Sequence, residues 1–513
     1  MRAVRLAAAI LIALAGYELL RWALLRAAKE HLHRRARRFA QQHGVRVDLF
    51  KFGGKLLVRE ALLNDLVVQR AMLAAAQAGE RPEEVRRRVE SYIDEIVPAF
   101  SLAAYYEVGM KLARAAIGAA YRPVVARRLR ELPRDATAVF LINHRSNFDY
   151  VVVGWALARQ VAISYAVGEW ARVFPLDALF KAFGGFFVRR GFPDPLYHTV
   201  LRRYLQLIAR QGVTQGIFPE GGLTRDGALR SPKVGLLDAL LQLSAEPGFD
   251  RDLLLVPVGI NYDRVLEDEV LLAEKRGLEH PPRAAAKLRG ALRLLWVVPS
   301  RVAVNVLRGA LGRLQRNGYV AVAFGEPVSL RRLAAERGWN LSRSSDDERR
   351  AIAKQVAGDL MGRIARVIPA TPVPLVARAL LELREASPSR LAERVRDLRN
   401  ELEELGVPTA LGAEFESQRR ARARLLEDED RNRDLLRLEG DVLLLEEAEE
   451  IVRLGIERLA RRGAAVSAGG AVRIGPHPHA LELLEYYARS LAVLDSGQRE
   501  LRGGAALATT AAK

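Results

Sequence analysis

Apolar and polar residues follow a regular pattern in the middle of the chain. From residue 137 onward, near-continuous apolar runs are separated by stretches with helical periodicity, for example residues 195–212. Continuous apolar runs are typical of strands buried on both faces, and their alternation with amphipathic helices predicts an α/β fold with a mixed, largely parallel sheet flanked by helices. The expected strands are residues 137–142, 161–167, 184–190, 213–218, 253–260 and 318–325.

The regions on either side are expected to be mainly helical. We assign residues 39–130 to an N-terminal helical region, 131–370 to the α/β domain and 371–513 to a C-terminal helical domain with a disordered tail. Within the last region, the apolar spacing of residues 391–405 predicts an amphipathic helix. Residues 467–479 are expected to form a loop, and their His-x-His is not expected to bind a metal because acidic and sulfur partners are missing.

Residues 1–38 combine an apolar run with a basic cluster. The apolar run, residues 6–17, is shorter than the ~20 residues of a spanning helix, but its apolar face continues beyond Arg21. Basic residues gather at positions 26–38. Such a combination is typical of a membrane anchor with a cytoplasmic basic flank, either spanning the bilayer or lying in its interface. A buried helix followed by a solvated basic turn is the alternative.

The chain carries a formal net charge of +19, which attracts polyanions. Nucleic acid is not an expected partner, because only 7% of the residues are aromatic and no stacking rings alternate with the basic residues. Residues 283–316 are rich in Arg and Lys and free of acids, which is typical of an amphipathic segment on an anionic membrane or of a helix pair covering the sheet. The absence of cysteine excludes disulfides, thiolate metal sites and cysteine nucleophiles.

His144 and Asp149 are the first candidates for chemistry. The sequence NHRSNFDY (143–150) follows an expected strand, and α/β proteins bind ligands where strands end. A carboxylate on the following turn can accept the Nδ1 proton of the imidazole and leave Nε2 as a base. Because the chain has no Gly-x-Ser-x-Gly elbow, the proton to be removed would belong to a substrate hydroxyl. A capping aspartate beside an incidental histidine is the alternative.

A second group of candidates follows the expected strand 213–218. Gly221 and Gly222 would allow the backbone to approach a ligand closely, and Glu220 could accept a hydrogen bond from a polyol hydroxyl. Basic residues that could receive a phosphate are Arg225, Arg230 and Lys233 here, and Arg189 and Arg190 at the end of another expected strand. In a roughly parallel sheet these strand ends share one rim, which predicts a site for a phosphorylated alcohol.

These motifs resemble the sequence blocks of the glycerol-3-phosphate acyltransferases, within the wider glycerolipid acyltransferase superfamily. The four blocks are similar to HRSNFDY (144–150), GGFFVRR (184–190), FPEGGLTRDG (218–227) and LLLVPVGINYD (253–263). Later segments of larger family members resemble GYVAVAFGEPVSL, IPATPVPLVARALL and LELLEYYARSLAVL. The resemblance therefore runs from about residue 137 to 494 and implies a glycerolipid acyltransferase-like fold.

The resemblance implies a role for each candidate residue. His144 would be the general base and Asp149 its orienting partner. The glycerol moiety would be bound by Glu220 and the Gly221–Gly222 backbone, the phosphate by Arg189, Arg190, Arg225 and Lys233, and the cleft wall would be shaped by Pro257. One position departs from the family pattern, because Leu223 replaces the first arginine of the third block. This change favours weakened or rearranged phosphate recognition, and with it another acceptor such as lysophosphatidate.

The activity implied is acyl transfer from acyl-CoA or acyl-carrier protein to the sn-1 hydroxyl of glycerol 3-phosphate, without metal or organic cofactor. The expected location is an anionic membrane surface, with the active site on the cytoplasmic face of the cytoplasmic membrane. Acylation of lysophosphatidate at its sn-2 hydroxyl is the alternative enzyme activity, and dihydroxyacetone phosphate is a further possible acceptor. A non-catalytic membrane scaffold is a third hypothesis, against which the intact His144, Asp149 and Glu220 argue.

Overall fold

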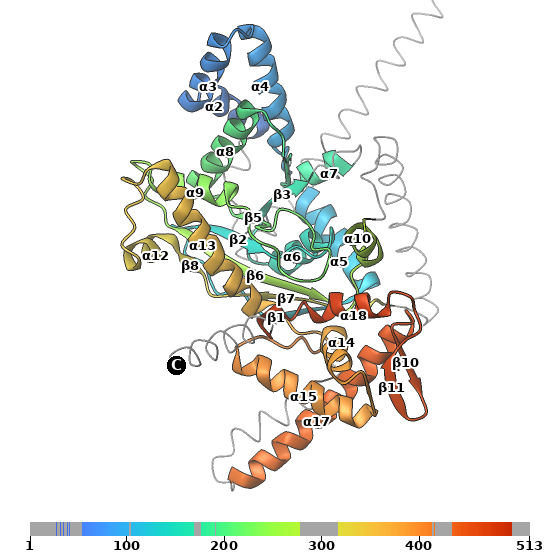
Figure 1. Ribbon diagram of the computed structural model, residues 1–513. Helices are drawn as coiled ribbons and strands as arrows, with labels where there is room; N and C mark the ends of the chain where they lie inside the picture. Colours follow the sequence, from blue (N-terminus) through green and yellow to red (C-terminus); the bar gives the residue numbers. More distant parts are fainter. Residues whose placement is uncertain are drawn as a thin grey trace, which may run out of the picture.

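A mixed β-sheet lies at the centre of the computed structural model, with helices on both faces and a helical C-terminal region at one end (Figure 1). The structure describes residues 54–101, 104–168, 176–189, 191–277, 316–412, 415 and 433–494, together with single positions between residues 27 and 41. The predicted α/β fold with a mixed, largely parallel sheet is therefore confirmed.

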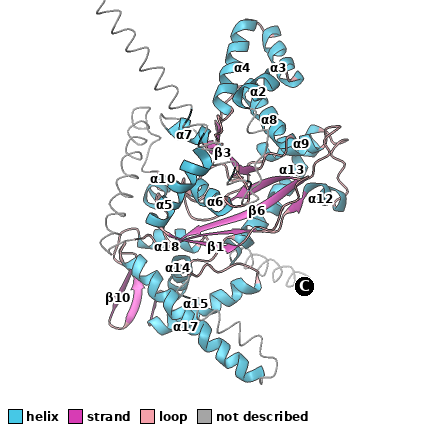
Figure 2. Ribbon diagram, turned by 180° about the vertical axis from the view of Figure 1, so that it is seen from behind, coloured by secondary structure: helices cyan, strands magenta, loops and turns pink. Residues whose placement is uncertain are grey.

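The central sheet has the strand order β1-β7-β6-β2-β5-β3-β4, and β8 also pairs with β6. Its strands are β1 (Arg122–Arg127), β2 (Thr137–Ile142), β3 (Ser164–Gly168), β4 (Phe186–Val188), β5 (Gln215–Ile217), β6 (Leu253–Tyr262), β7 (Tyr319–Phe324) and β8 (Val328–Ser329). Strand β7 is antiparallel to β6 and parallel to β1. Figure 2 shows from behind how the long strand β6 crosses the middle of the sheet.

Five neighbouring strands run in one direction. Strand β2 pairs in parallel with β5 and β6, and β3 pairs in parallel with β5 and β4. Their carboxyl ends therefore lie along one edge of the sheet. The loops after Ile142, Val188 and Ile217, which carry the candidate residues, all begin at this edge, so that the predicted common rim is confirmed.

Both faces of the sheet are buried. Phe140 and Ile142 of β2 belong to one buried cluster, whereas Val139 and Leu141 belong to another on the opposite face. The first cluster is covered by α5 (Met110–Ala120), α6 (Asp149–Leu157) and part of the C-terminal region, the second by α9 (Gly235–Ser244), α12 (Leu330–Glu336) and α13 (Asp346–Val367). Burial on both faces explains the near-continuous apolar runs of the strands.

Helices α2 (Gly54–Leu63), α3 (Leu66–Gln77) and α4 (Pro82–Ile96) pack against α8 (Pro195–Arg210) beyond the β4 edge and share a third buried cluster with it. The π-helical turn η2 (Ala104–Gly109) precedes α5, and two short helices, α7 (Leu176–Ala182) and α10 (Asp268–Lys275), follow β3 and β6. Of the predicted N-terminal helical region, the described residues from 54 to 120 are mainly helical. Strand β1 also lies within the range assigned to this region, but it belongs to the central sheet.

The C-terminal region consists of α14 (Pro372–Leu383), α15 (Pro388–Glu404), α17 (Arg433–Ala460) and α18 (Ala480–Ala488), with a small sheet of order β10-β11-β9. Its strands are β9 (Glu385–Ala386), β10 (Ala465–Ala468) and β11 (Ala471–Ile474). The expected loop at residues 467–479 is in part a hairpin. Gly469 and Gly470 have φ values of +60° and +77°, the left-handed conformation that a two-residue hairpin turn requires.

Some predictions concern residues outside the described part of the chain. The residues concerned are Arg190, the C-terminal tail, most of the basic segment 283–316, and the N-terminal anchor except for isolated positions. Within the described residues, no helix combines the length and apolarity that crossing a bilayer would require.

Candidate active site

His144 and Asp149 form a buried pair at the carboxyl end of β2. The Nδ1 atom of His144 lies 3.0 Å from Oδ2 of Asp149, and the two side chains are 1% and 0% exposed. The sequence brings them together because the chain turns once after β2 and then begins α6 at Asp149. With the Nδ1 proton donated to the carboxylate, Nε2 of His144 carries the free lone pair and can accept a proton.

The carboxylate of Asp149 is held by four donors. Its Oδ2 accepts the backbone N–H groups of Arg145 (2.8 Å) and Ser146 (3.1 Å) in addition to His144. Its Oδ1 accepts the hydroxyl of Tyr262, the last residue of β6, at 2.6 Å. Asp149 is also the first residue of α6, where the helix dipole favours a negative charge. These contacts stabilise an ionised carboxylate that orients the imidazole.

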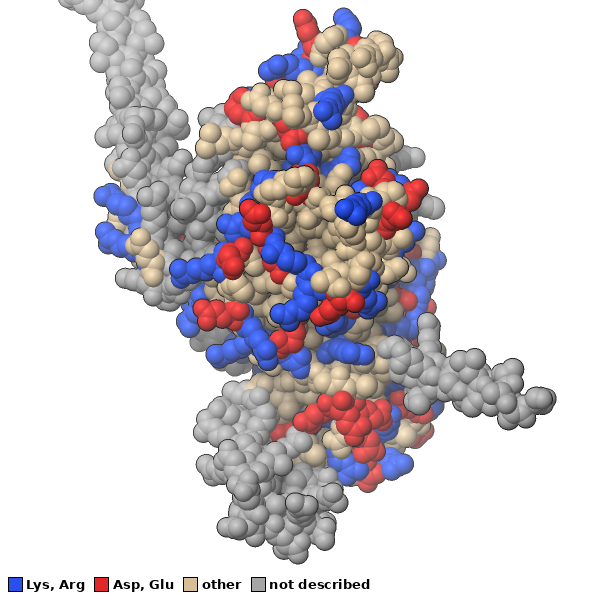
Figure 3. All heavy atoms as spheres, turned by 90° about the vertical axis from the view of Figure 1, so that its left-hand side faces the viewer, with Lys and Arg blue, Asp and Glu red and all other residues tan. Residues whose placement is uncertain are grey.

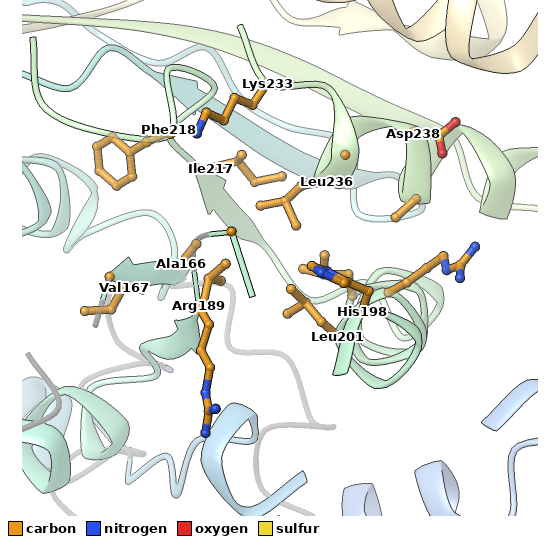
Figure 4. A pocket seen from close by; sticks show the side chains of 18 of the residues that line it. Ala166, Val167, Arg189, His198, Leu201, Ile217, Phe218, Lys233, Leu236 and Asp238 are labelled. Atoms are coloured by element: carbon orange, nitrogen blue, oxygen red, sulfur yellow. The ribbon is translucent and has the colours of Figure 1, made fainter. Parts of the chain in front are cut away.

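A cavity of about 380 Å³ opens beside His144. Its reactive end is lined by His144, Tyr150 and Phe218, and the ring centroid of Phe218 lies 4.2 Å from that of His144. Apolar side chains from β4, β5, α8 and α9 form its middle, namely Val188, Ile217, Leu201, Leu205 and Leu236. Besides His144 and Tyr150, the polar side chains along its lining are Arg189, His198, Arg202, Lys233 and Asp238. Figure 4 shows Leu236 and Leu201 on opposite sides of this space.

Glu220 joins the loop after β5 to the loop that carries the histidine. Its Oε1 accepts the backbone N–H of His144 at 2.8 Å, and its Oε2 accepts that of Arg230 at 2.9 Å. The N–H of Thr224 donates in return to the carbonyl of His144 at 3.1 Å. The structure therefore places both oxygens of Glu220 in bonds within the chain, and its expected contact with a polyol hydroxyl stays a prediction.

Burial raises the pKa of Glu220 from its ordinary 4.5 to about 7, although the two backbone donors and the nearby Arg145 act in the opposite direction. Burial also raises the pKa of Glu267, whose carboxylate accepts the hydroxyl of Ser146 at 2.8 Å and the N–H of Asn147 at 3.1 Å. The loop around His144 thus rests on the buried carboxyl group of Glu220 and the partly buried one of Glu267.

Two of the predicted cations, Arg189 and Lys233, line the cavity. The side chain of Lys233 extends toward the end of the cavity at which Phe218 lies (Figure 4). The stem of Lys233 passes over Gly221, since a Cβ added to that glycine would lie 2.7 Å from Lys233 Cδ. Gly221 has a φ of +64°, so that both its conformation and this close approach call for glycine. Gly222 beside it is buried.

Arg189 follows β4 but points away from the middle of the cavity (Figure 4). Its Nε donates to Oε1 of Glu95 at 2.7 Å, and its Nη2 donates to Oε2 of the same carboxylate. The guanidinium also lies over the ring of Phe192, 4.4 Å from the centroid. Glu95, at the end of α4, was not among the predicted site residues. The structure thus gives Arg189 a partner within the chain, and its expected phosphate contact stays a prediction.

The remaining predicted residues lie outside the lining of the cavity. Arg225 forms an ion pair with Glu274 of α10 (2.7 Å) and is half exposed. Leu223, which replaces an arginine of the family pattern, packs against the buried core. Pro257 is paired with Leu141 of β2 in the middle of the sheet and is buried. The predicted roles of Arg225 and Pro257 in substrate binding stay predictions.

Helix α18 and the residue after it contact both loops of the site, the one after β2 and the one after β5. Arg145, which follows the histidine, donates to the carbonyl of Gly227 at 3.2 Å and lies over the ring of Tyr486, 5.2 Å from its centroid. Gly227 touches the backbone of α18, because a Cβ added to it would lie 1.8 Å from the carbonyl oxygen of Tyr486. Arg489 also forms an ion pair with Asp226 at 3.1 Å. The C-terminal region therefore contacts the site directly.

Several residues of the site were not singled out from the sequence. Tyr262 lies within the fourth family-like block but received no role, and Tyr150 closes the first block. His198 and Arg202 are one turn apart on α8, an arrangement that shows only once α8 is placed beside the cavity. The described residues contain no cluster of His, Asp and Glu suited to a metal ion.

Two family models match the chain. Residues 124–261 match the model described as Acyltransferase, and residues 303–458 match the glycerol-3-phosphate acyltransferase C-terminal region. Together the two matches span more than half of the chain. The first match runs from β1 to β6 and includes the loops of His144 and Glu220, and the second includes β7, β8, α12 to α15 and nearly all of α17.

Similar proteins include a glycerol-3-phosphate acyltransferase of Aeromonas hydrophila subsp. hydrophila, which is 30% identical over 365 residues. This alignment covers 67% of the chain but 42% of the relative, so the chain spans less than half of the length of that protein. Among solved structures, the 1-acyl-sn-glycerophosphate acyltransferase PlsC of Thermotoga maritima is 15% identical, with a TM-score of 0.27, covering 60% of this chain and 97% of that one. By its two family models and the sequence relative, the chain belongs to the glycerol-3-phosphate acyltransferase family.

Proposed function

We propose that the protein transfers an acyl group from a thioester donor, acyl-CoA or acyl-carrier protein, to the sn-1 hydroxyl of glycerol 3-phosphate. The observation that carries this proposal is the buried His144–Asp149 pair at the end of a cavity that combines apolar walls with Lys233. The family relationship and the named activity of the Aeromonas relative support the same reaction.

His144 acts as the general base in this reaction. Its Nε2 takes the proton of the acceptor hydroxyl while the hydroxyl oxygen attacks the thioester carbonyl carbon. The C–S bond then breaks, the ester forms, and the proton passes from His144 to the leaving thiolate. Asp149 stays ionised throughout and stabilises the imidazolium that exists between the two proton transfers. Burial of the pair strengthens this interaction because bulk water does not screen it.

Lys233 binds the phosphate of the acceptor. Its ammonium group has no carboxylate within ion-pair distance among the described residues. The guanidinium groups of Arg189 and Arg225, in contrast, each form an ion pair. Without a carboxylate partner in the described part of the chain, the ammonium group is available to a dianionic ligand, while the stem of Lys233 lies against the backbone of Gly221. A lysine in this position attracts phosphate as a point charge.

The apolar middle of the cavity receives the acyl chain of the donor. Leu201 of α8 faces Leu236 of α9 across it (Figure 4), and Leu205 also lines it. Burying hydrocarbon there contributes about 0.8 kcal/mol per methylene group. Leu223 gives no reason to prefer lysophosphatidate as the acceptor, because its side chain packs against the core and is not part of this lining.

We further propose that the protein works at the cytoplasmic face of the cytoplasmic membrane, to which residues 1–38 and the basic segment 283–316 attach it. Support comes from the sequence of these segments and from the acyl chains of the substrates. On the described face turned to the viewer in Figure 3, Lys and Arg are interspersed with Asp and Glu and do not form one continuous basic surface. Anionic lipid is therefore bound through the two segments and not through this face.

The proposal is tested with purified protein in detergent, offered labelled glycerol 3-phosphate, dihydroxyacetone phosphate or lysophosphatidate with either donor. Transfer to glycerol 3-phosphate is expected. Lys233→Ala should raise the KM for this acceptor by about 10- to 100-fold, as loss of a charge-assisted contact does, and should leave the KM for the donor nearly unchanged. Lys354→Ala, which removes an exposed lysine of α13 outside the cavity lining, is the matched control.

Two results would contradict the proposal. Transfer to lysophosphatidate without transfer to glycerol 3-phosphate would identify the alternative enzyme. Equal acceptor KM values for the Lys233 variant and the control would remove Lys233 from the phosphate site, and Arg225→Ala measured in parallel shows whether that arginine binds the phosphate instead.

A further inference from the structure

Tyr262 lies at the point where the sheet meets the catalytic pair. It is the last residue of β6, is paired with Val320 of β7 and is fully buried. Its hydroxyl donates to Oδ1 of Asp149 at 2.6 Å. The residues are 113 positions apart in the sequence, so this contact joins the end of β6 to the loop that carries His144.

The two oxygens of Asp149 are held in different ways. Oδ2 accepts from His144 and from the backbone of the same loop. Within the described part of the chain, Oδ1 has the Tyr262 hydroxyl as its hydrogen-bond partner. A carboxylate held through one oxygen alone can still rotate about its Cβ–Cγ bond, and that rotation would move Oδ2 away from Nδ1. The second bond, from outside the loop, fixes the rotation.

The phenol that makes this bond is itself immobile. The ring of Tyr262 packs edge-on against the ring of Tyr121, with centroids 5.5 Å apart. The hydroxyl of Tyr121 takes no part in this contact, because it donates to the carbonyl of Arg264 at 2.7 Å. Burial, with the charge of Asp149 as a further cause, raises the pKa of Tyr262 well above its ordinary value. The hydroxyl therefore keeps its proton, and with it the ability to donate, at neutral pH.

We propose that Tyr262 is a positioning residue for acyl transfer, which holds the Asp149 carboxylate in the rotation that keeps the Nδ1–H bond of His144 and thereby presents Nε2 to the acceptor hydroxyl. Tyr262 touches no substrate and does not line the cavity. Its effect is therefore on the rate of the proton transfer and not on the binding of either substrate. The inference rests on the proposed acyl transfer because the test measures kcat of that reaction. Any acceptor that the wild type uses is suitable for the measurement.

The experiment compares Tyr262→Phe with Tyr121→Phe. Both variants remove one buried phenolic hydroxyl from the same pair of rings, but only Tyr262 contacts Asp149. Tyr262→Phe should lower kcat by about ten-fold, part of the 10²–10⁴-fold that general-base catalysis contributes, with both KM values unchanged. Tyr121→Phe should keep a kcat near that of the wild type, while the melting temperatures of the two variants stay within a few degrees of each other.

A double-mutant cycle with Asp149→Asn separates positioning from a structural effect. If Tyr262 acts through the carboxylate, Tyr262→Phe should lower kcat no further once Asp149 is replaced, because residues in one network are not additive. Equal kcat values for the two phenylalanine variants, or a full additional loss in the Asp149→Asn background, would overturn the inference. Absence of transfer by the wild type to every acceptor would instead contradict the proposed function.

Discussion

Arg189 and Glu95 form a bidentate ion pair between the end of β4 and the end of α4, with side chains 21% and 7% exposed. The pair ties the N-terminal helices to the strand edge at which the cavity opens. The aromatic ring of Phe192 covers the guanidinium on one side. Arg189, which lies in the second family-like sequence block (184–190), is thus part of the packing between the sheet and the N-terminal helices.

Breaking this pair should cost stability. Glu95→Gln leaves the mostly buried guanidinium of Arg189 without its counter-charge, and loss of one partner of such a pair costs about 3 kcal/mol. Thermal unfolding is expected to begin at a lower temperature than in the wild type, with the acceptor KM unchanged. If Glu95→Gln left the melting temperature intact but lowered the acceptor KM strongly, the released Arg189 would be identified as a phosphate ligand.

His144→Ala and Asp149→Asn should impair the enzyme in different ways. The first removes the base, and kcat should fall by about 10²–10⁴-fold. The second keeps a base but favours the wrong tautomer, because the amide can donate to Nδ1, and partial activity should remain. Steady-state kinetics with saturating substrates measures both. Near-normal turnover of a well-folded His144→Ala protein would refute general-base catalysis by this residue.

Glu220 predicts a pH dependence of stability. Its pKa is raised from 4.5 to about 7 in the folded state, so the folded protein binds the proton more tightly than the unfolded chain does. The stability that this group contributes is therefore fully present below about pH 4.5 and is lost as the pH rises to about 7. At 1.36 kcal/mol per pKa unit, the loss amounts to about 3 kcal/mol in total. Folding is favoured by protonation of the buried carboxyl group.

The measurement is the free energy of unfolding of wild type and Glu220→Gln between pH 4 and 8. The difference between them isolates this carboxyl group from the other titrating residues. The stability of the wild type relative to the variant should decrease across the window. A difference that stays constant, or that increases with pH, would show that Glu220 is not protonated preferentially in the folded protein.

Membrane attachment should depend on two segments. Deletion of residues 1–38 is expected to shift protein toward the soluble fraction, and the part that remains bound should wash off in 1 M salt, where the Debye length is about 3 Å. Fractionation of cell extracts at low and high salt measures this. Full-length protein that stays in solution without detergent would contradict the attachment.

The fold was predictable where burial imposed a simple pattern. Strands β2, β6 and β7 are buried at every position, and all three were predicted as apolar runs. Strand β1 lies at the edge of the sheet, contains Pro123 and is only partly buried, so that its sequence shows no such run. The β10–β11 hairpin consists of short, half-exposed strands, and its Gly-Gly turn was the one available signal.

The site was predictable only as far as its contacts are local. His144 and Asp149 are five residues apart, and a single turn brings them together. The contacts of Glu95 with Arg189 and of Tyr262 with Asp149 span 94 and 113 residues, and they depend on how helices and strands pack. Basic residues near the strand ends predict a phosphate site, which stays a prediction, and the internal partners of Arg189 and Arg225 become visible only in three dimensions.

The contact between Gly227 and the backbone of Tyr486 has a consequence for the order of events during synthesis. The strands and loops of the cleft leave the ribosome well before α18, which is made near the end of the described chain. Domains generally begin to fold as they emerge, but the loop of Gly227 has its final support only when α18 has docked against it. A nascent chain that has completed its sheet therefore still lacks the final support of this loop until translation has passed α18.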